Sequence, residues 1–171
     1  MNNTKAFSLI ELLICISFVA AMFLIAVPYW GGFVKKNQVR ACADELTKAL
    51  QFARAVAIRN NEPAKFCGSS DFESCNDSWN SGAIVIAEKS KRVIRVFASE
   101  FSKCNLTWHG NFGKRSSITF LPSGFPDGQH GSVYCCPKDS AEYALSIILS
   151  STGRLRISQK TADGEIIPCN L

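Results

Sequence analysis

A long apolar run near the N-terminus constrains this chain more than any other feature. Between Phe7 and Val34 the only side chain charged at neutral pH is Glu11. The most apolar part, from Phe7 to Val27, is about 21 residues long, and a helix of that length crosses a hydrocarbon core of roughly 30 Å. The run therefore predicts one membrane-inserted helix at residues 7–34. An ordinary secretory signal is the alternative, but the run is long, contains a charge and has no Ala-x-Ala-like cleavage site near its end.

The residues around Glu11 carry a specific motif. A carboxylate one turn inside an apolar helix is costly in lipid and normally has a partner or marks a function. Residues 6–12 read Ala-Phe-Ser-Leu-Ile-Glu-Leu and resemble the type IV prepilin cleavage motif. The resemblance implies that residues 1–6 are a leader peptide, which a prepilin peptidase removes by cutting between Ala6 and Phe7. It also implies a single-pass inner-membrane protein that later enters a pilus fibre in the periplasm or at the cell surface, where Glu11 pairs with the positive N-terminus of a neighbouring pilin subunit.

The chain after the apolar run predicts a helix followed by β-strands. Residues 35–62 place apolar side chains three or four positions apart, as in an amphipathic helix that packs on a sheet; an oligomer seam is the alternative. Residues 63–171 contain short β-prone runs separated by turn-rich segments, without internal repeats. The expected architecture is α+β, with a long N-terminal helix packed on an antiparallel β-sheet domain. Strands are expected at 64–67, 83–87, 93–97, 106–108, 118–121, 133–135, 143–149 and 155–157.

Eight cysteines are more than a cytosolic protein of this length usually contains. Cys15 lies in the apolar run and Cys42 in the helix that follows, which leaves six in the remaining globular part. An even number in a small exported domain indicates a disulfide framework, whose pairing stays open, and an oxidising compartment such as a bacterial periplasm or cell surface. The six candidates are Cys67, Cys75, Cys104, Cys135, Cys136 and Cys169.

The sequence predicts neither a metal site nor a catalytic site. It contains no C-x-x-C pair, and His109 and His130 have no partner at zinc-ligand spacing. It also contains no Gly-x-Ser-x-Gly motif and no phosphate-binding glycine-rich loop before a helix. We therefore expect a protein that is not an enzyme and needs no cofactor, in which both histidines have structural or loop roles.

Several segments outside the apolar run resemble the GspH/FimT group of minor pilins and pseudopilins. The resemblance implies a type IV pilin-like fold and a low-abundance subunit near the tip of a type IV pilus or of the type II secretion pseudopilus. Its FimT-like members imply a link to DNA uptake in natural transformation. The segments are Glu45-Leu46 through Leu50, Ala53-Arg54, Ala57 to Asn60, Ile118-Thr119-Phe120 with Gly124, and Ser150 to Arg154.

A hairpin near the C-terminus is the predicted binding element. Residues 146–160 read as two strands joined by a tight turn, to which Gly153 is suited. Because side chains alternate along a strand, we expect the even-numbered residues from Arg154 to Lys160 on one face, with Leu155 and Ile157 toward the core. Successive residues on one face are about 6.6 Å apart, which is comparable to the gap between neighbouring phosphates of a nucleic acid.

The hypothesis drawn from this spacing is that the hairpin holds the phosphate backbone of extracellular double-stranded DNA. Each arginine can bind a phosphate through its planar guanidinium group, so binding is expected to be independent of base sequence and weakened by salt. The alternative is that the arginines are the solvated face of an edge strand, kept charged against aggregation. The residues expected to contact DNA are Arg154 and Arg156, supported by Lys114, Arg115, Lys138 and Lys160.

A purely structural role is the rival function. In this interpretation the chain is a GspH-like pseudopilin that supports pseudopilus assembly in type II secretion and contacts no nucleic acid. The net charge of +5 allows an anionic partner but does not require one.

A second basic zone, from Lys35 to Lys65, lies close to the membrane end of the helix and is expected to face lipid headgroups or neighbouring subunits.

Overall fold

A computed structural model describes residues 8–79, 81–98, 101, 104–111, 117–138 and 142–169, without the side chains of residues 25–29. The chain divides into two compact units, Met1–Lys35 and Lys36–Leu171. One helix, α1 (Leu9–Asn60), begins in the first unit and ends in the second.

In the first unit, α1 carries apolar side chains that are exposed all around the helix. Leu9 is 76% exposed and Leu24 is 80% exposed, and most apolar side chains between them are more than half exposed. A helix that is apolar on every side is stable only when lipid or other protein surrounds it. Within the described residues, no helix contains enough consecutive apolar sequence to span a membrane.

In the second unit, the apolar stripe of α1 forms the centre of the core. Val39, Leu46, Leu50 and Ala57 are all at most 1% exposed. They belong to one buried cluster together with side chains of both sheets described below. Intramolecular packing, rather than an oligomer seam, therefore covers this stripe. The helix ends at Asn60, close to the predicted end.

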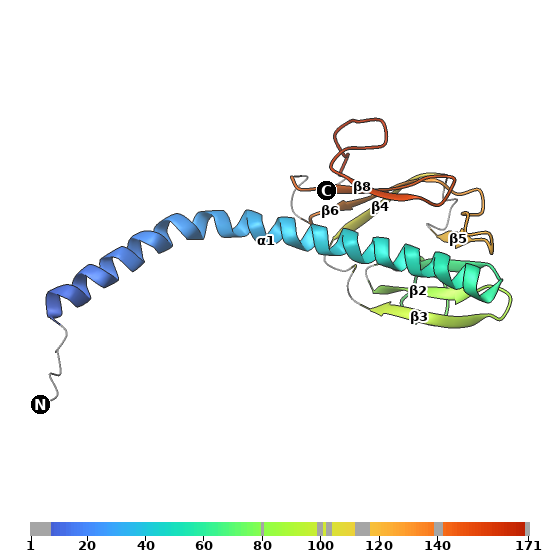
Figure 1. Ribbon diagram of the computed structural model, residues 1–171, viewed down its shortest axis with the longest axis horizontal. Coiled ribbons are helices and arrows are strands. Elements are labelled where there is room, and N and C mark those ends of the chain that lie inside the picture. Colours follow the sequence, from blue (N-terminus) through green and yellow to red (C-terminus); the bar gives the residue numbers. More distant parts are fainter. Residues whose placement is uncertain are drawn as a thin grey trace, which may run out of the picture. The chain divides into compact units, whose positions relative to one another are not determined.

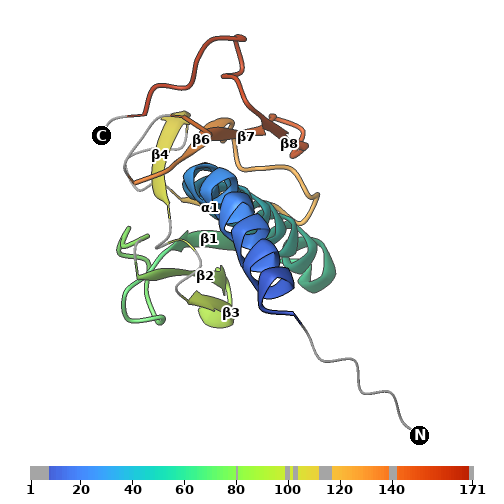
Figure 2. The same ribbon diagram turned by 90° about the vertical axis from the view of Figure 1, so that its left-hand side faces the viewer.

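The described residues contain eight strands in two antiparallel sheets. They are β1 (Ala64–Gly68), β2 (Gly82–Ala87), β3 (Arg92–Ala98), β4 (Asn105–Gly110), β5 (Ile118–Phe120), β6 (Gly131–Cys136), β7 (Leu145–Leu149) and β8 (Leu155–Ser158). One four-stranded sheet has the order β3-β2-β1-β5 and the other has the order β4-β6-β7-β8. Figure 1 shows β2 and β3 on one side of the C-terminal part of α1 and β4, β6 and β8 on the other. Figure 2, viewed along the helix, shows the same separation.

All eight predicted strands are confirmed, with ends that differ by at most two residues. The predicted architecture, a long N-terminal helix followed by an antiparallel β-sheet domain, is confirmed, and the strands of this domain form two sheets. The division arises because β4 pairs with β6, with Asn105 opposite Cys136, and does not join β3. Such pairing depends on contacts between distant segments, whereas each strand is recognisable from its own β-prone residues and the turn-rich segments around it.

Three disulfides join Cys42 to Cys104, Cys67 to Cys75, and Cys136 to Cys169. The expected set of six cysteines is thus corrected at one member, and the pairing that the sequence left open is given by the structure. Cys135 is a buried free thiol, and Cys42, on the helix, takes its place. The reason is helical periodicity, because Cys42 lies in the buried stripe of α1, at 2% exposure, and so reaches the sheet domain.

Candidate nucleic-acid interface

Strands β7 and β8 form the hairpin that carries the candidate site. Leu149 pairs with Leu155 across the turn. The N–H of Ser150 donates to the carbonyl of Arg154, and the N–H of Arg154 donates to the hydroxyl of Ser150, both at 3.0 Å. These bonds fix the backbone of Arg154 at the point where β8 begins.

Gly153 is required by the geometry of this turn. Its φ of +79° lies in the left-handed region that favours glycine. A Cβ at this position would lie 2.9 Å from the carbonyl oxygen of Gly124, which is too close. The guanidinium of Arg54, on α1, donates to the carbonyl of Gly153 at 3.0 Å. The turn is therefore held against both the helix and the 121–126 turn. Phe125 follows Gly124 in that turn and is 48% exposed. No motif in the sequence marks it as a candidate binding residue.

The side chain of Arg156 is exposed on the edge strand β8, and that of Arg154 is exposed at the residue directly before this strand. Among the described residues, β8 is the last strand of its sheet and has a neighbouring strand on one side only. Within the described part of the chain, neither arginine forms an ion pair. Residues two apart on a strand lie on the same face, about 6.6 Å from each other. The two guanidinium groups can therefore bind two neighbouring anionic groups.

The middle of this sheet face is covered. Arg156 lies in one cross-strand row with Ile148 and Ser132, but Ser132 is only 2% exposed. In the next row, Tyr134 is 3% exposed and belongs to a small second cluster with Ile167 of the C-terminal segment. The C-terminal segment is attached there by the Cys136–Cys169 disulfide, so the candidate interface is limited to β8 and its turn.

Two expectations about the hairpin are corrected. Strand β8 ends at Ser158, and the N–H of Lys160 donates to the hydroxyl of Ser158 at 3.1 Å. Lys160 therefore lies beyond the strand and does not extend the row of arginines. Ile157 is opposite the buried Ile147 but is itself 39% exposed, because an edge strand has a neighbour on one side only.

The supporting lysines do not gather around the arginine pair. Lys138 is exposed and follows the end of β6, which pairs with the beginning of β7. Arg154 lies at the other end of the hairpin, so the strand register places Lys138 at the opposite end of the sheet. Lys114 and Arg115 lie outside the described residues, as do the cleavage-site residues Ala6 and Phe7.

Two basic residues of the second basic zone line a separate groove. Lys36 and Arg40 of α1 lie there beside Leu145, Gln159 and Ile166, around a space of about 380 Å³. The C-terminal segment forms the other side of this groove, and a disulfide holds that segment in position. The groove was therefore not predictable from the helix pattern.

The comparisons with known proteins agree with this architecture. The sequence model of the family described as Type II transport protein GspH matches residues 43–153. None of the curated proteins matches the sequence significantly. Solved structures of two bacterial proteins are similar to this chain.

The type IV minor pilin FimU of Pseudomonas aeruginosa is 20% identical, with a TM-score of 0.58 over 77% of this chain and 98% of that chain. The minor pseudopilin EpsH of the Vibrio cholerae type 2 secretion system is 11% identical, with a TM-score of 0.51 over 71% of this chain and 96% of that chain. At these identities the likeness shows the fold alone. The sequence match, which extends over most of the chain, together with this pilin-like fold, shows that the protein belongs to the GspH family of minor pilins and pseudopilins.

Proposed function

We propose that this chain is a minor subunit of a type IV pilus that binds extracellular double-stranded DNA through β8 and supports DNA uptake in natural transformation. The observation that carries the proposal is the pair Arg154 and Arg156. Arg156 is exposed on the edge strand β8 and Arg154 is exposed directly before it, and neither has an acidic partner among the described residues. The family and the fold are those of structural proteins, and the proposal includes no catalytic step.

The physical basis of the binding is charge rather than base recognition. Arginine binds phosphate through two parallel N–H donors, which is a strong and geometrically defined contact. With two such contacts per subunit, affinity per subunit is modest and depends steeply on salt, because counterions are released from the DNA. A fibre that displays DNA at its surface needs no base specificity.

Assembly of the fibre depends on the N-terminal unit. In the proposal, a prepilin peptidase removes residues 1–6, and residues 7–34 anchor the subunit in the inner membrane before they enter the fibre core. The support is the sequence, in which Glu11 is the only charge between Phe7 and Val34. The carboxylate of Glu11 then pairs with the N-terminal amine of a neighbouring pilin subunit. This pairing offsets the cost of its burial.

The test compares two double variants that remove the same charge. Arg154→Gln with Arg156→Gln changes the start of β8 and the residue directly before it, and Lys89→Gln with Arg92→Gln changes exposed positions in the β2–β3 turn and at the start of β3, an edge strand of the other sheet. DNA affinity is measured by fluorescence anisotropy at several salt concentrations, with the full chain in detergent and with residues 36–171, which contain the whole described core.

The β8 variant is expected to lose at least about tenfold in affinity, and the slope of log K against log salt is expected to fall by about two. The DNA affinity of the β3 variant should stay within about threefold of that of the unchanged protein, because a change in net charge away from the binding site has only a small effect. Equal losses in the two variants would mean that net charge, and not the β8 site, attracts DNA. Wild-type affinity that does not depend on salt would exclude phosphate binding.

The second candidate function is that of a type II secretion pseudopilin. It is favoured by the description of the matching family and by the likeness to a minor pseudopilin. Deletion of the gene separates the two functions. Loss of transformation with intact secretion supports the pilus function, and loss of secretion with intact transformation supports the alternative.

A further inference from the structure

Three buried cysteines meet in the core of the second unit. The sulfur atoms of Cys42, Cys104 and Cys135 all lie within 4.8 Å of one another. They come from α1, from the residue just before β4, and from β6. Each is at most 2% exposed. Three sulfurs can form only one disulfide among themselves, so one of them must remain a thiol.

The structure joins Cys42 to Cys104 and leaves Cys135 as the thiol. The same proximity places Cys135 within reach of either partner. We propose that Cys42, Cys104 and Cys135 form one disulfide-exchange site with two covalent states. In the first, the Cys42–Cys104 bond ties α1 to the sheet domain; in the second, a Cys104–Cys135 bond lies within the sheet and releases the helix.

The exchange step needs no external oxidant or reductant. Cys135 gives up its proton to solvent, and its thiolate attacks the sulfur of Cys104. The new Cys104–Cys135 bond forms as the Cys42–Cys104 bond breaks, and Cys42 leaves as a thiolate that takes up a proton. One disulfide and one thiol are present before and after, so electrons and protons balance.

The two states differ in what they hold together. The Cys42–Cys104 bond closes a loop with a sequence separation of 62 and attaches the helix covalently. The alternative bond joins two segments that strand pairing already keeps together, because Leu106 pairs with Cys135. It leaves α1 attached through packing alone. The choice of partner therefore decides whether a pull on the helix is resisted by a covalent bond or by the core.

Exchange is slow once the domain has folded. Burial raises the pKa of the Cys135 thiol to about 12. At neutral pH very little of the thiol is then ionised, and attack by the thiolate is slow. In the unfolded chain the thiol has its ordinary pKa near 8.5. The state is therefore selected during oxidative folding and kept afterwards.

The experiment maps cysteine pairing in single variants of the full chain. The protein is produced in an oxidising compartment, denatured, alkylated and digested, and its peptides are identified by mass spectrometry. In the Cys42→Ala variant we expect the Cys104–Cys135 disulfide and complete loss of alkylation at both residues. In the Cys135→Ala control we expect the Cys42–Cys104 disulfide to remain. If Cys104 and Cys135 are both alkylated in Cys42→Ala while Cys67–Cys75 and Cys136–Cys169 are intact, the proposal is wrong.

A second measurement covers the case in which Cys42→Ala fails to fold. The unchanged protein is reduced, refolded in a glutathione buffer, and quenched with acid at successive times. The proposal expects the Cys104–Cys135 peptide as an intermediate that declines as the Cys42–Cys104 peptide accumulates. Its absence at every time point would overturn the proposal.

Discussion

Gly153 shows how one residue determines the shape of the candidate site. Its left-handed backbone and its contact with the carbonyl of Gly124 both exclude a side chain. Gly128 offers a comparison, because its φ of +67° is similar but a Cβ there would meet nothing within 4 Å. Alanine substitutions at the two glycines therefore separate the effect of backbone strain from the effect of steric contact.

The Gly153→Ala variant is expected to lower the free energy of unfolding by about 2 to 4 kcal/mol, and Gly128→Ala by about 1 kcal/mol. The difference between the two losses is the free energy needed to move the 121–126 turn and the hairpin apart. Urea unfolding followed by circular dichroism measures both variants. Equal losses would show that the Gly124 contact relaxes without cost.

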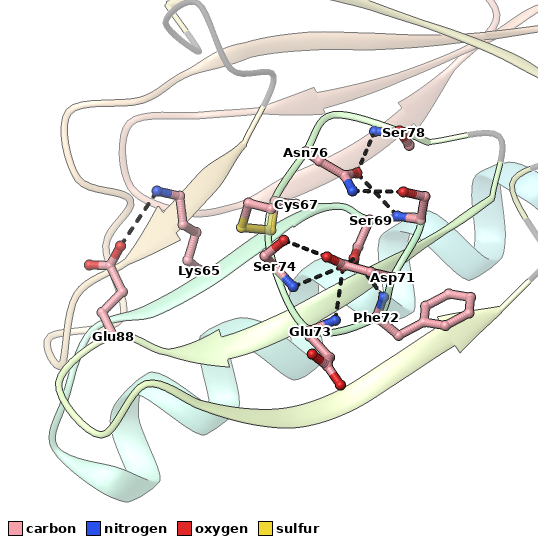
Figure 3. The surroundings of a disulfide bond; sticks show 12 residues. Lys65, Cys67, Ser69, Asp71, Phe72, Glu73, Ser74, Asn76, Ser78 and Glu88 are labelled. Atoms are coloured by element: carbon pink, nitrogen blue, oxygen red, sulfur yellow. Dashed lines mark hydrogen bonds and ion pairs between the residues drawn. A yellow bond between two sulfur atoms is a disulfide. The ribbon is translucent and has the colours of Figure 1, made fainter.

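Asp71 organises a short loop closed by the Cys67–Cys75 disulfide (Figure 3). Its carboxylate accepts hydrogen bonds from the hydroxyl and the N–H of Ser74, from the N–H of Glu73 and from the hydroxyl of Ser69. These bonds, those of Ser74 first, hold the pKa of Asp71 well below its ordinary value. They favour the charged form of the carboxylate.

This shift predicts a pH dependence with a definite sign. A lowered pKa in the folded state contributes stability that is present above the unfolded pKa of about 3.9 and is lost as pH falls through the folded pKa. The difference in unfolding free energy between the unchanged protein and Asp71→Asn should thus be constant from about pH 5 to 8 and shrink toward pH 2. Asp77→Asn, which removes a charge two residues after this loop, is the control. A difference that stays constant down to pH 2 would contradict the shift.

Among the elements, the two loop-closing disulfides of the sheet domain form a matched pair. Cys67–Cys75 has a sequence separation of 8 and Cys136–Cys169 one of 33, and each pair has one buried and one half-buried member. A disulfide stabilises mainly by restricting the unfolded chain, and more so for a longer loop. The C-terminal pair is therefore expected to matter more.

Replacing both cysteines by alanine should cost about 2 to 3 kcal/mol at Cys67–Cys75 and about 3 to 4 kcal/mol at Cys136–Cys169. Denaturant unfolding of the two double variants measures the order. The reverse order would show that native contacts of the two segments, and not chain entropy, dominate.

The edge strands provide the internal comparison for the arginine pair. Strand β3 is also an edge strand with exposed arginines, but Arg95 lies over the rings of Phe52 and Phe97, at 5.1 and 4.9 Å from their centroids. This arginine has a structural partner, whereas Arg154 and Arg156 form no ion pair in the described ranges. Charge on an edge strand also prevents pairing with other chains. The comparison of DNA affinity between the β8 and β3 variants therefore distinguishes arginines that bind DNA from arginines that only prevent the strand edge from pairing with other chains.

For the whole molecule, the central question is how the apolar first unit is used. In the proposed fibre, Glu11 has a positive partner on a neighbouring subunit, and breaking a buried pair by removing one member costs about 3 to 5 kcal/mol. Glu11→Gln is therefore expected to reduce incorporation into fibres by at least about tenfold while the amount in the membrane fraction is unchanged. Ser17→Ala, a neutral change in the same helix, is the control. Immunoblots of sheared fibres and of membranes measure both, and normal incorporation of Glu11→Gln would disprove the pairing.

The sequence by itself determined the elements of this protein. The period of three to four residues from Val39 to Ala57 and the β-prone composition of the eight short runs are local properties, so the helix, the strands and the tight turn at Gly153 could all be predicted. The family resemblance followed from the same residues. The arginines of β8 could also be chosen in advance, because alternation places them on one face.

Tertiary structure alone decided which distant segments meet. It divided the strands into two sheets, paired Cys42 with Cys104 in place of Cys135, and placed Lys138 far from Arg154 along the sheet. It also ended β8 before Lys160. These outcomes depend on packing between residues that are many positions apart. Local periodicity carries no information about such contacts, because the same strand can pair with several partners before the core selects one.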